Sequence, residues 1–166
     1  MKHFALILSA IVMLTLGACS DDMPAPKQND ALYGIYSRGA DEFMEIDDLD
    51  WIYQYNLEDF DGEQYWVKRK LTYLYEPVSE LMLREDTDGL LQVDKVISVT
   101  DKDMVLCWVG TPMTDGADSD DAKFEIIQIF FKNDYKPDPA NYRTYTRITA
   151  ADLKAGLGSI EVIEAY

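Results

Sequence analysis

The sequence predicts an all-β domain in which about eight antiparallel strands follow one another as a meander and close into a barrel, with one short C-terminal helix. From Leu32 onward, short runs rich in Tyr, Trp, Val and Ile alternate with Gly, Asp, Asn and Pro, which is typical of successive strands. Asp61-Gly62 and Asp88-Gly89 fall between such runs, and Asp-Gly readily adopts the positive φ angles of tight hairpins. Closure is expected because it removes exposed sheet edges.

The individual elements follow from the same pattern. The expected strands are 32–37, 50–57, 64–75, 80–85, 90–100, 104–109, 123–132, 142–148 and 159–164. The segments 110–122 and 133–141 carry proline with aspartate or asparagine and are expected to be loops. Thr149 is a candidate N-cap for a short helix over 150–155, because Asp152 follows three residues later and Gly156 and Gly158 can end the helix.

Residues 1–18 are expected to be an export signal. Lys2 precedes an apolar run over 4–16, which is too short to cross a hydrocarbon core that needs about 20 helical residues. Leu16-Gly17-Ala18 before Cys19 resembles the lipobox of bacterial lipoproteins. This resemblance implies a lipid on the Cys19 thiol, a membrane anchor and removal of residues 1–18. An ordinary secretory signal that happens to contain a cysteine is the alternative.

Residues 19–31 are expected to be the lipidated cysteine and a flexible tether to one domain, 32–166. The segment lacks apolar periodicity and contains Pro24 and Pro26. Its Cys-Ser-Asp-Asp start is similar to the acidic export signal of surface lipoproteins in the Bacteroidota, which implies the outer membrane and its cell-surface face. A merely solvated acidic linker on a protein facing the periplasm is the alternative.

Composition excludes several functions. The formal net charge is −16, so nucleic acid is not an expected partner, and nothing in the sequence implies a cofactor. His3 is the one histidine and lies in the signal, so a mature Ser-His-Asp or Cys-His site is excluded, and we expect no enzyme. Chemistry that uses carboxylates alone stays open. We expect Cys107 to be a buried thiol and the Asp-rich segments to be turns rather than calcium loops.

The domain resembles the lipocalin-like lipoproteins of the Bacteroidota. The resemblance rests on Gly34-Ile35-Tyr36, Leu81-Met82-Leu83, the run 93–99 with Thr100-Asp101-Lys102-Asp103, Met104-Val105-Leu106, and a short helix followed by a last strand. Lipocalins proper usually carry Gly-x-Trp where this chain has Gly34-Ile35-Tyr36. The resemblance implies a barrel that binds one small apolar or amphiphilic ligand.

Alternation along the strands selects candidate ligand-binding residues. Trp51, Tyr53 and Tyr55 share one face of their strand, which we expect to point inward. Arg69 falls on the same parity as Tyr73, and Lys95 on the same parity as its apolar neighbours, so two cations are expected inside. An inward cation needs a carboxylate, tyrosine hydroxyls or an acidic ligand as its partner.

Two alternatives stay open for these residues. A β-bulge can reverse the parity partway along a strand, and a cation at the open rim can reach water. The barrel can also be filled by its own side chains, and the protein then serves as a non-catalytic interaction module for another envelope protein. Both alternatives predict no ligand at Arg69 or Lys95.

Overall fold

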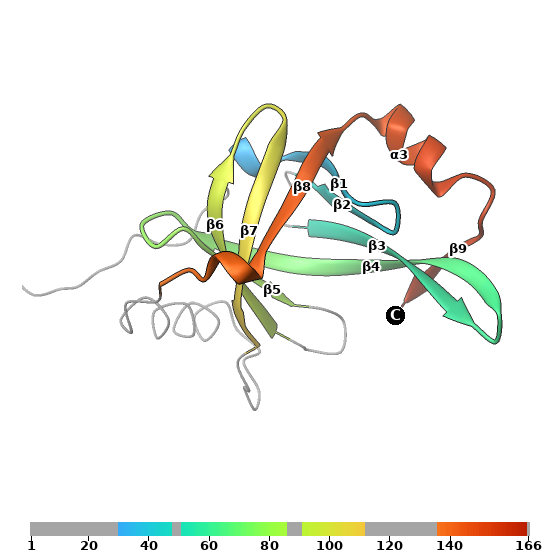
Figure 1. Cartoon of the computed structure of the whole chain (residues 1–166), viewed down its shortest axis with the longest axis horizontal. Helices are drawn as coiled ribbons and strands as arrows, with labels where there is room; N and C mark the ends of the chain where they lie inside the picture. Colours follow the sequence, from blue (N-terminus) through green and yellow to red (C-terminus); the bar gives the residue numbers. More distant parts are fainter. Residues whose placement is uncertain (1–29, 48–50, 86–90, 112–135, 166) are drawn as a thin grey trace, which may run out of the picture.

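The computed structural model describes residues 30–47, 51–85, 91–111 and 136–165, which form a closed β-barrel with one helix beside it (Figure 1). Each of the first seven strands pairs antiparallel with the next one in the chain, and the eighth pairs back with the first. A ninth strand adds to the outside of the fourth in parallel orientation. The predicted all-β meander barrel with a short C-terminal helix is therefore confirmed.

The elements have the following bounds: η1 Asp30–Leu32, β1 Gly34–Arg38, β2 Glu42–Ile46, β3 Trp51–Phe60, β4 Glu63–Glu76, β5 Leu81–Glu85, β6 Leu91–Val99, β7 Asp103–Gly110, η2 Pro139–Asn141, β8 Tyr142–Ile148, α3 Ala150–Leu157 and β9 Val162–Ala165.

The longest hairpin, β3–β4, projects beyond the rest of the barrel (Figure 1). Its turn is Asp61-Gly62, with φ angles of 57° and 87°, between the paired residues Phe60 and Glu63. Asp59 stabilises this turn because its Oδ1 accepts a hydrogen bond from the Gly62 amide at 2.9 Å. The Asp-Gly prediction is thus confirmed at this position.

The barrel interior contains an apolar cluster from β1 to β8. Its most enclosed members, each 0 % exposed, are Tyr36, Met44, Ile52, Met82, Met104 and Leu106. No water-sized space touches these side chains, so this part of the interior is filled by the chain itself. Burial of such apolar area is the main favourable contribution to folding.

One end of the barrel is sealed by η1. Leu32 is fully buried there, and its carbonyl accepts a hydrogen bond from the Tyr36 hydroxyl at 2.9 Å. Arg147 of β8 lies over the Tyr36 ring, 4.9 Å from its centroid, and donates to the carbonyl oxygens of Tyr33 at 2.6 Å and Ala31 at 3.0 Å. One guanidinium therefore joins the last barrel strand, the first strand and the segment that caps them.

Helix α3 packs on the outer face of the sheet. Thr149 and Asp152 form a capping box at its N-terminus, and Gly158 ends it with a φ of 60°. Leu153 packs against Phe43 and Trp66, and the Trp66 indole donates to the Leu157 carbonyl at 3.1 Å. The sheet thus buries apolar side chains on both faces in this region.

Strand β2 is missing from the strands that the sequence predicts. Glu42, Phe43, Met44 and Ile46 are all buried, because one face of β2 meets the interior and the other meets α3. The five residues therefore show no alternation with period two. The two glutamates also interrupt the apolar run, so the sequence does not indicate a buried strand. The predicted strand 123–132 and the Asp88-Gly89 turn lie outside the described residues.

The contact of α3 with the sheet depends on Gly156. A Cβ at this position would collide with Cζ of Phe43 and lie 3.1 Å from its Cε1. Phe43 cannot move away easily because its ring packs 5.1 Å from that of Trp66. We expect Gly156→Ala to lower the free energy of unfolding by about 1 kcal/mol or more, although alanine favours helices by about 1 kcal/mol.

Chemical denaturation of Gly156→Ala, Phe43→Leu and the double variant checks this expectation. Leucine at position 43 removes the ring edge that meets the new methyl group. The double variant is therefore expected to lose less free energy of unfolding than the sum of the losses in the two single variants. Simple additivity would contradict the proposed contact.

Candidate functional site

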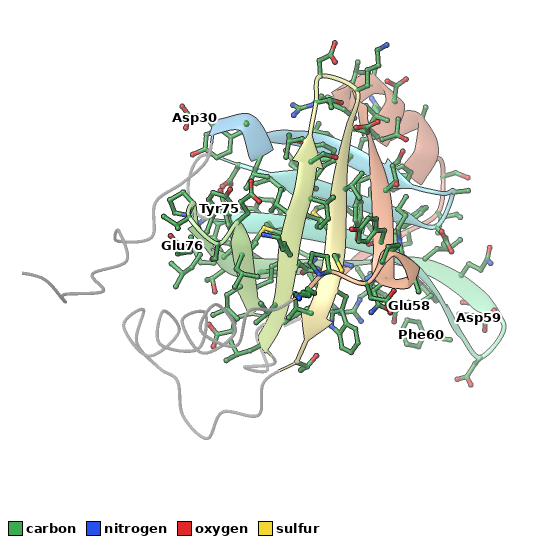
Figure 2. All side chains as sticks on the ribbon, turned by 60° about the vertical axis from the view of Figure 1, so that its left-hand side comes forward. Asp30, Glu58, Asp59, Phe60, Tyr75 and Glu76 are labelled. Atoms are coloured by element: carbon green, nitrogen blue, oxygen red, sulfur yellow. The ribbon has the colours of Figure 1, made fainter. Side chains whose placement is uncertain are left out.

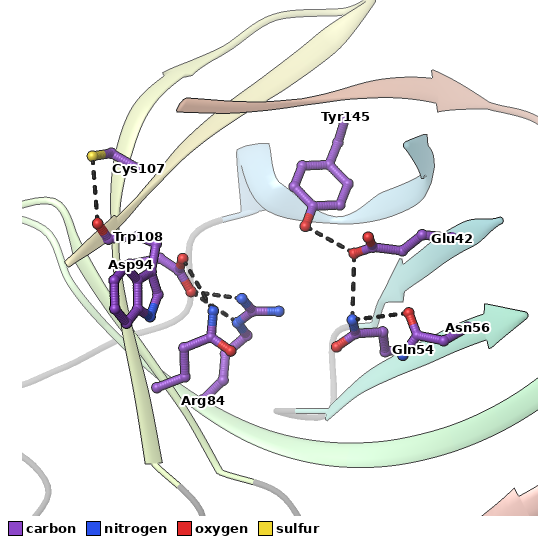
Figure 3. A network of polar contacts seen from close by, with 9 residues as sticks. Glu42, Gln54, Asn56, Arg84, Asp94, Cys107, Trp108 and Tyr145 are labelled. Atoms are coloured by element: carbon purple, nitrogen blue, oxygen red, sulfur yellow. Dashed lines mark hydrogen bonds and ion pairs between the residues drawn. The ribbon is translucent and has the colours of Figure 1, made fainter. Parts of the chain in front are cut away.

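Polar side chains face the interior away from the sealed end. Figure 3 shows Glu42 of β2, and Figure 2 shows Glu58 of β3 toward the tip of the β3–β4 hairpin. The Glu42 carboxylate forms an ion pair with Arg38 and accepts hydrogen bonds from the Tyr145 hydroxyl at 2.9 Å and from Gln54 Nε2 at 3.3 Å. Glu42 is 5 % exposed, so this charge is compensated almost entirely by protein groups. Burial raises the pKa of Tyr145 to about 12.

A buried ion pair lies across the interior from Glu42 (Figure 3). Arg84 donates to Asp94 Oδ2 from Nε at 3.0 Å and from its terminal nitrogen at 2.7 Å, and the two side chains are 3 % and 0 % exposed. Burial is the largest single effect and disfavours the Arg84 charge. The attraction and hydrogen bonding of Asp94, together with Tyr145 and Glu42, outweigh it and raise the pKa of Arg84. Both the pair and the Glu42 group were missed from the sequence.

Arg69 faces inward as the sequence predicts, level with Gln54 of β3. Its partner is Glu58, whose Oε1 accepts from the guanidinium at 2.7 Å, and both side chains are about one third exposed, 33 % and 31 %. Tyr73 also lies inside, 3 % exposed, in the apolar cluster. A solvent-accessible ion pair of this kind contributes little to stability, so Arg69 can exchange partners at small cost.

The prediction that Trp51, Tyr53 and Tyr55 point inward is wrong. They share the outer face of β3, where Tyr53 and Tyr55 join the cluster under α3. Outward lysines of β4 lie over these rings, with Lys70 Nζ 3.5 Å from the Trp51 ring centroid and Lys68 Nζ 4.8 Å from that of Tyr53. The aromatic face was mistaken for the interior because this sheet is covered on both faces.

The prediction that Lys95 points inward is also wrong, and a β-bulge explains part of the error. Lys95 Nζ donates to the Ser79 carbonyl at 2.7 Å and lies 3.3 Å from Glu80, in the β4–β5 turn on the outside of the sheet. Val96 and Val99 both pack into the interior cluster, because a register shift between Val96 and Ser98 reverses the parity. Constant alternation therefore fails along β6.

All five arginines of the chain face the barrel interior. Arg147 belongs to the sealed end, and three others pair with the inward carboxylates Glu42, Glu58 and Asp94. The lysines of the described strands, by contrast, point outward. Sequence reasoning identified Arg69 alone, since the other arginines lie on strands of only five to seven residues.

Arg143 is the arginine that has no carboxylate partner among the described residues. It lies opposite Leu106 of β7, on the inward parity of Tyr145 and Arg147, and is partly buried. Trp108 is two residues beyond Leu106 on the same face, opposite Asp94, and is 36 % exposed. The end of the barrel opposite η1 therefore combines a partly exposed indole with a guanidinium that has no carboxylate partner among the described residues.

Other candidate groups add no chemistry to this site. Cys107 is buried, as predicted, and Cys19 lies outside the described residues. Within the described ranges, no group of three or more His, Cys, Asp or Glu side chains could hold a metal ion. In the same ranges, no helix combines the length and the apolar character needed to cross a membrane.

Comparison with known proteins adds no relative. No protein-family model, curated protein or solved structure matches the chain. The chemistry of the site is therefore inferred from its own geometry.

Asp94 is expected to be critical for stability. Asp94→Asn keeps the shape but leaves Arg84 charged and buried without a counterion, which should lower the free energy of unfolding by about 3–5 kcal/mol. The double variant Arg84→Met with Asp94→Leu should lower the free energy of unfolding much less. Urea denaturation compares these variants with Asp101→Asn, an exposed control. Equal losses in the single and double variants would contradict the model of an uncompensated charge.

Tyr145 is expected to make stability depend on alkaline pH. Its pKa is raised from 10.0 to about 12 in the folded state, so the stabilisation is complete below pH 10 and is lost as the pH rises toward 12. Relative to Tyr145→Phe, the wild-type free energy of unfolding should fall by about 1.4 kcal/mol per pH unit in that window. Denaturation at a series of pH values measures the difference, with Tyr142→Phe as the exposed control.

Proposed function

We propose that this protein is a lipid-anchored lipoprotein of the outer membrane, on its cell-surface face, whose lipocalin-like barrel binds one small amphiphilic molecule. The anchor follows from the lipobox-like residues before Cys19, and the surface location from the acidic start of the tether. The binding function rests on the polar end of the barrel.

The inward placement of the arginines carries the binding proposal. In a chain with 31 acidic and 15 basic residues, every arginine occupies an inward-facing position of a barrel strand, and four of them belong to the end opposite η1. Guanidinium groups recognise carboxylate and phosphate through paired hydrogen bonds. We therefore expect the interior to bind a molecule with an acidic group. The acidic exterior repels such groups and offers them no competing site.

The filled core limits the depth of the site. Met44, Met82, Met104 and Leu106 leave no space around them. The bound molecule is therefore small and lies in the outer part of the barrel, with its apolar portion against Trp108 rather than in the centre. This shallow position departs from the deep ligand cavity that a barrel of about eight strands can enclose.

The same filled core supports a second candidate function. A barrel packed by its own side chains needs no ligand, and the protein could then be a non-catalytic accessory module that binds another envelope protein. The Arg84–Asp94 and Arg38–Glu42 pairs are self-sufficient, which favours this alternative.

Native mass spectrometry of residues 20–166 separates the two functions. This chain contains every described element, all of which lie between Asp30 and Ala165. After exposure to cell-extracted lipids, we expect one bound molecule that is lost on denaturation. Arg69→Ala should reduce its affinity by about tenfold, because a hydrogen bond to a charged group is worth about 1.5 kcal/mol or more.

Lys70→Ala is the matched control. It removes a positive charge from the next residue of β4, on the outer face. The same loss in both variants would indicate nonspecific attraction. A bare mass for the wild type after exposure to lipids would overturn the binding function and favour the accessory module.

A further inference from the structure

We infer that Arg143 binds the acidic group of the bound molecule, a carboxylate or a phosphate monoester, at the polar end of the barrel beside Trp108. This assignment rests on the proposed binding function and names the chemical class and the anchoring residue. Among the described residues, Arg143 has no acceptor for its guanidinium, although it faces the barrel interior.

The other inward arginines are already occupied. Arg84 donates twice to Asp94, Arg38 is paired with Glu42, and Arg147 donates to Tyr33, Ala31 and the Tyr36 hydroxyl. Binding an anion at Arg84 or Arg38 would leave a buried carboxylate without its counterion, which is costly. Arg69 can exchange Glu58 for a ligand more easily, because that ion pair is accessible to solvent. Arg69 is therefore a secondary contact for the ligand.

The charge balance at this end favours an anion. Among the described residues, Arg38, Arg69, Arg84 and Arg143 face three inward carboxylates, Glu42, Glu58 and Asp94, so these groups leave one positive charge uncompensated. An anion restores neutrality in a partly dehydrated space, where charge-assisted hydrogen bonds are stronger than in water. The interior position also shields the anion from the negative charge of the exterior.

Trp108 supplies the apolar contact for the rest of the molecule. It is a diagonal cross-strand neighbour of Arg143 on the same face, a relation that places side chains within contact of a shared ligand. Its indole is 36 % exposed, whereas Leu106 below it is fully buried. An alkyl or ring portion that extends from the acidic group can therefore cover the indole without entering the filled core.

Isothermal titration calorimetry of residues 20–166 with four probes tests the assignment. The probes are decanoate, decyl phosphate, decanol and inorganic phosphate. We expect the two acidic amphiphiles to bind at least tenfold more tightly than decanol. Arg143→Gln should remove this preference, and Arg143→Lys should retain part of it because the charge remains.

The matched control is Lys102→Gln. It removes one positive charge near the sealed end, where the Lys102 carbonyl accepts from the Arg147 amide. Binding of decanoate should be unchanged in this variant. Arg143→Gln leaves no ionic partner unpaired among the described residues, and thermal unfolding verifies that it folds.

The three tryptophans provide a second readout that does not depend on affinity. On addition of decanoate, the indole N–H resonance of Trp108 should shift, whereas those of Trp51 and Trp66 on the outer face should not. A shift confined to the outer tryptophans would overturn the assignment of the site.

The outcomes separate the assignment from the proposed function. Wild-type affinity for decanoate in Arg143→Gln would overturn the role of Arg143 and leave the binding function intact. Inorganic phosphate that binds as tightly as decyl phosphate, and is lost in Arg143→Gln, would support the anion site and overturn the amphiphilic ligand. Failure of the wild type to bind any probe would overturn both.

Discussion

The pairing of β8 with β1 is the constraint on which the rest of the structure depends, because it converts a meander into a barrel. Tyr36 lies opposite Arg147 in this pairing, and Ile35 lies opposite Ile148. Arg147 then connects β8 to the carbonyl oxygens before β1 and covers the Tyr36 ring. With the sheet closed, the inward parity of each strand is fixed, and so is the position of every arginine.

The antiparallel meander, the Asp61-Gly62 hairpin and the helix after Thr149 could be predicted from the sequence. These features depend on local chemistry: turn residues that tolerate positive φ, a capping box, and runs of β-branched and aromatic residues. The face of each strand was harder to predict. Tyr53 and Tyr55 have the aromatic character expected of interior residues. They lie on the outer face, because α3 covers that face with apolar side chains as well.

The candidate site could be predicted only in part for the same reason. Arg69 and Tyr73 lie on a long strand with regular alternation, and both were placed correctly inside. Lys95 precedes a β-bulge that no residue type in the sequence indicates. Strand β2, which carries Glu42, is five residues long and buried on both faces. Arg143 and Trp108 become neighbours only through the β7–β8 register, which the sequence does not specify.

The separation of arginine from lysine follows from their different hydration. An ammonium group is strongly hydrated and compact, so Lys68 and Lys70 stay outside, where they cover aromatic rings. A guanidinium is more weakly hydrated and presents several donors in one plane, so it tolerates burial beside a carboxylate. Stability alone does not require this ionic layer, since well-packed apolar side chains often replace a buried ion pair without loss. The barrel nevertheless keeps Arg84 and Asp94 inside, and Arg143 faces the interior without a carboxylate partner among the described residues. The acidic ligand that we propose would supply the opposite charge at that position.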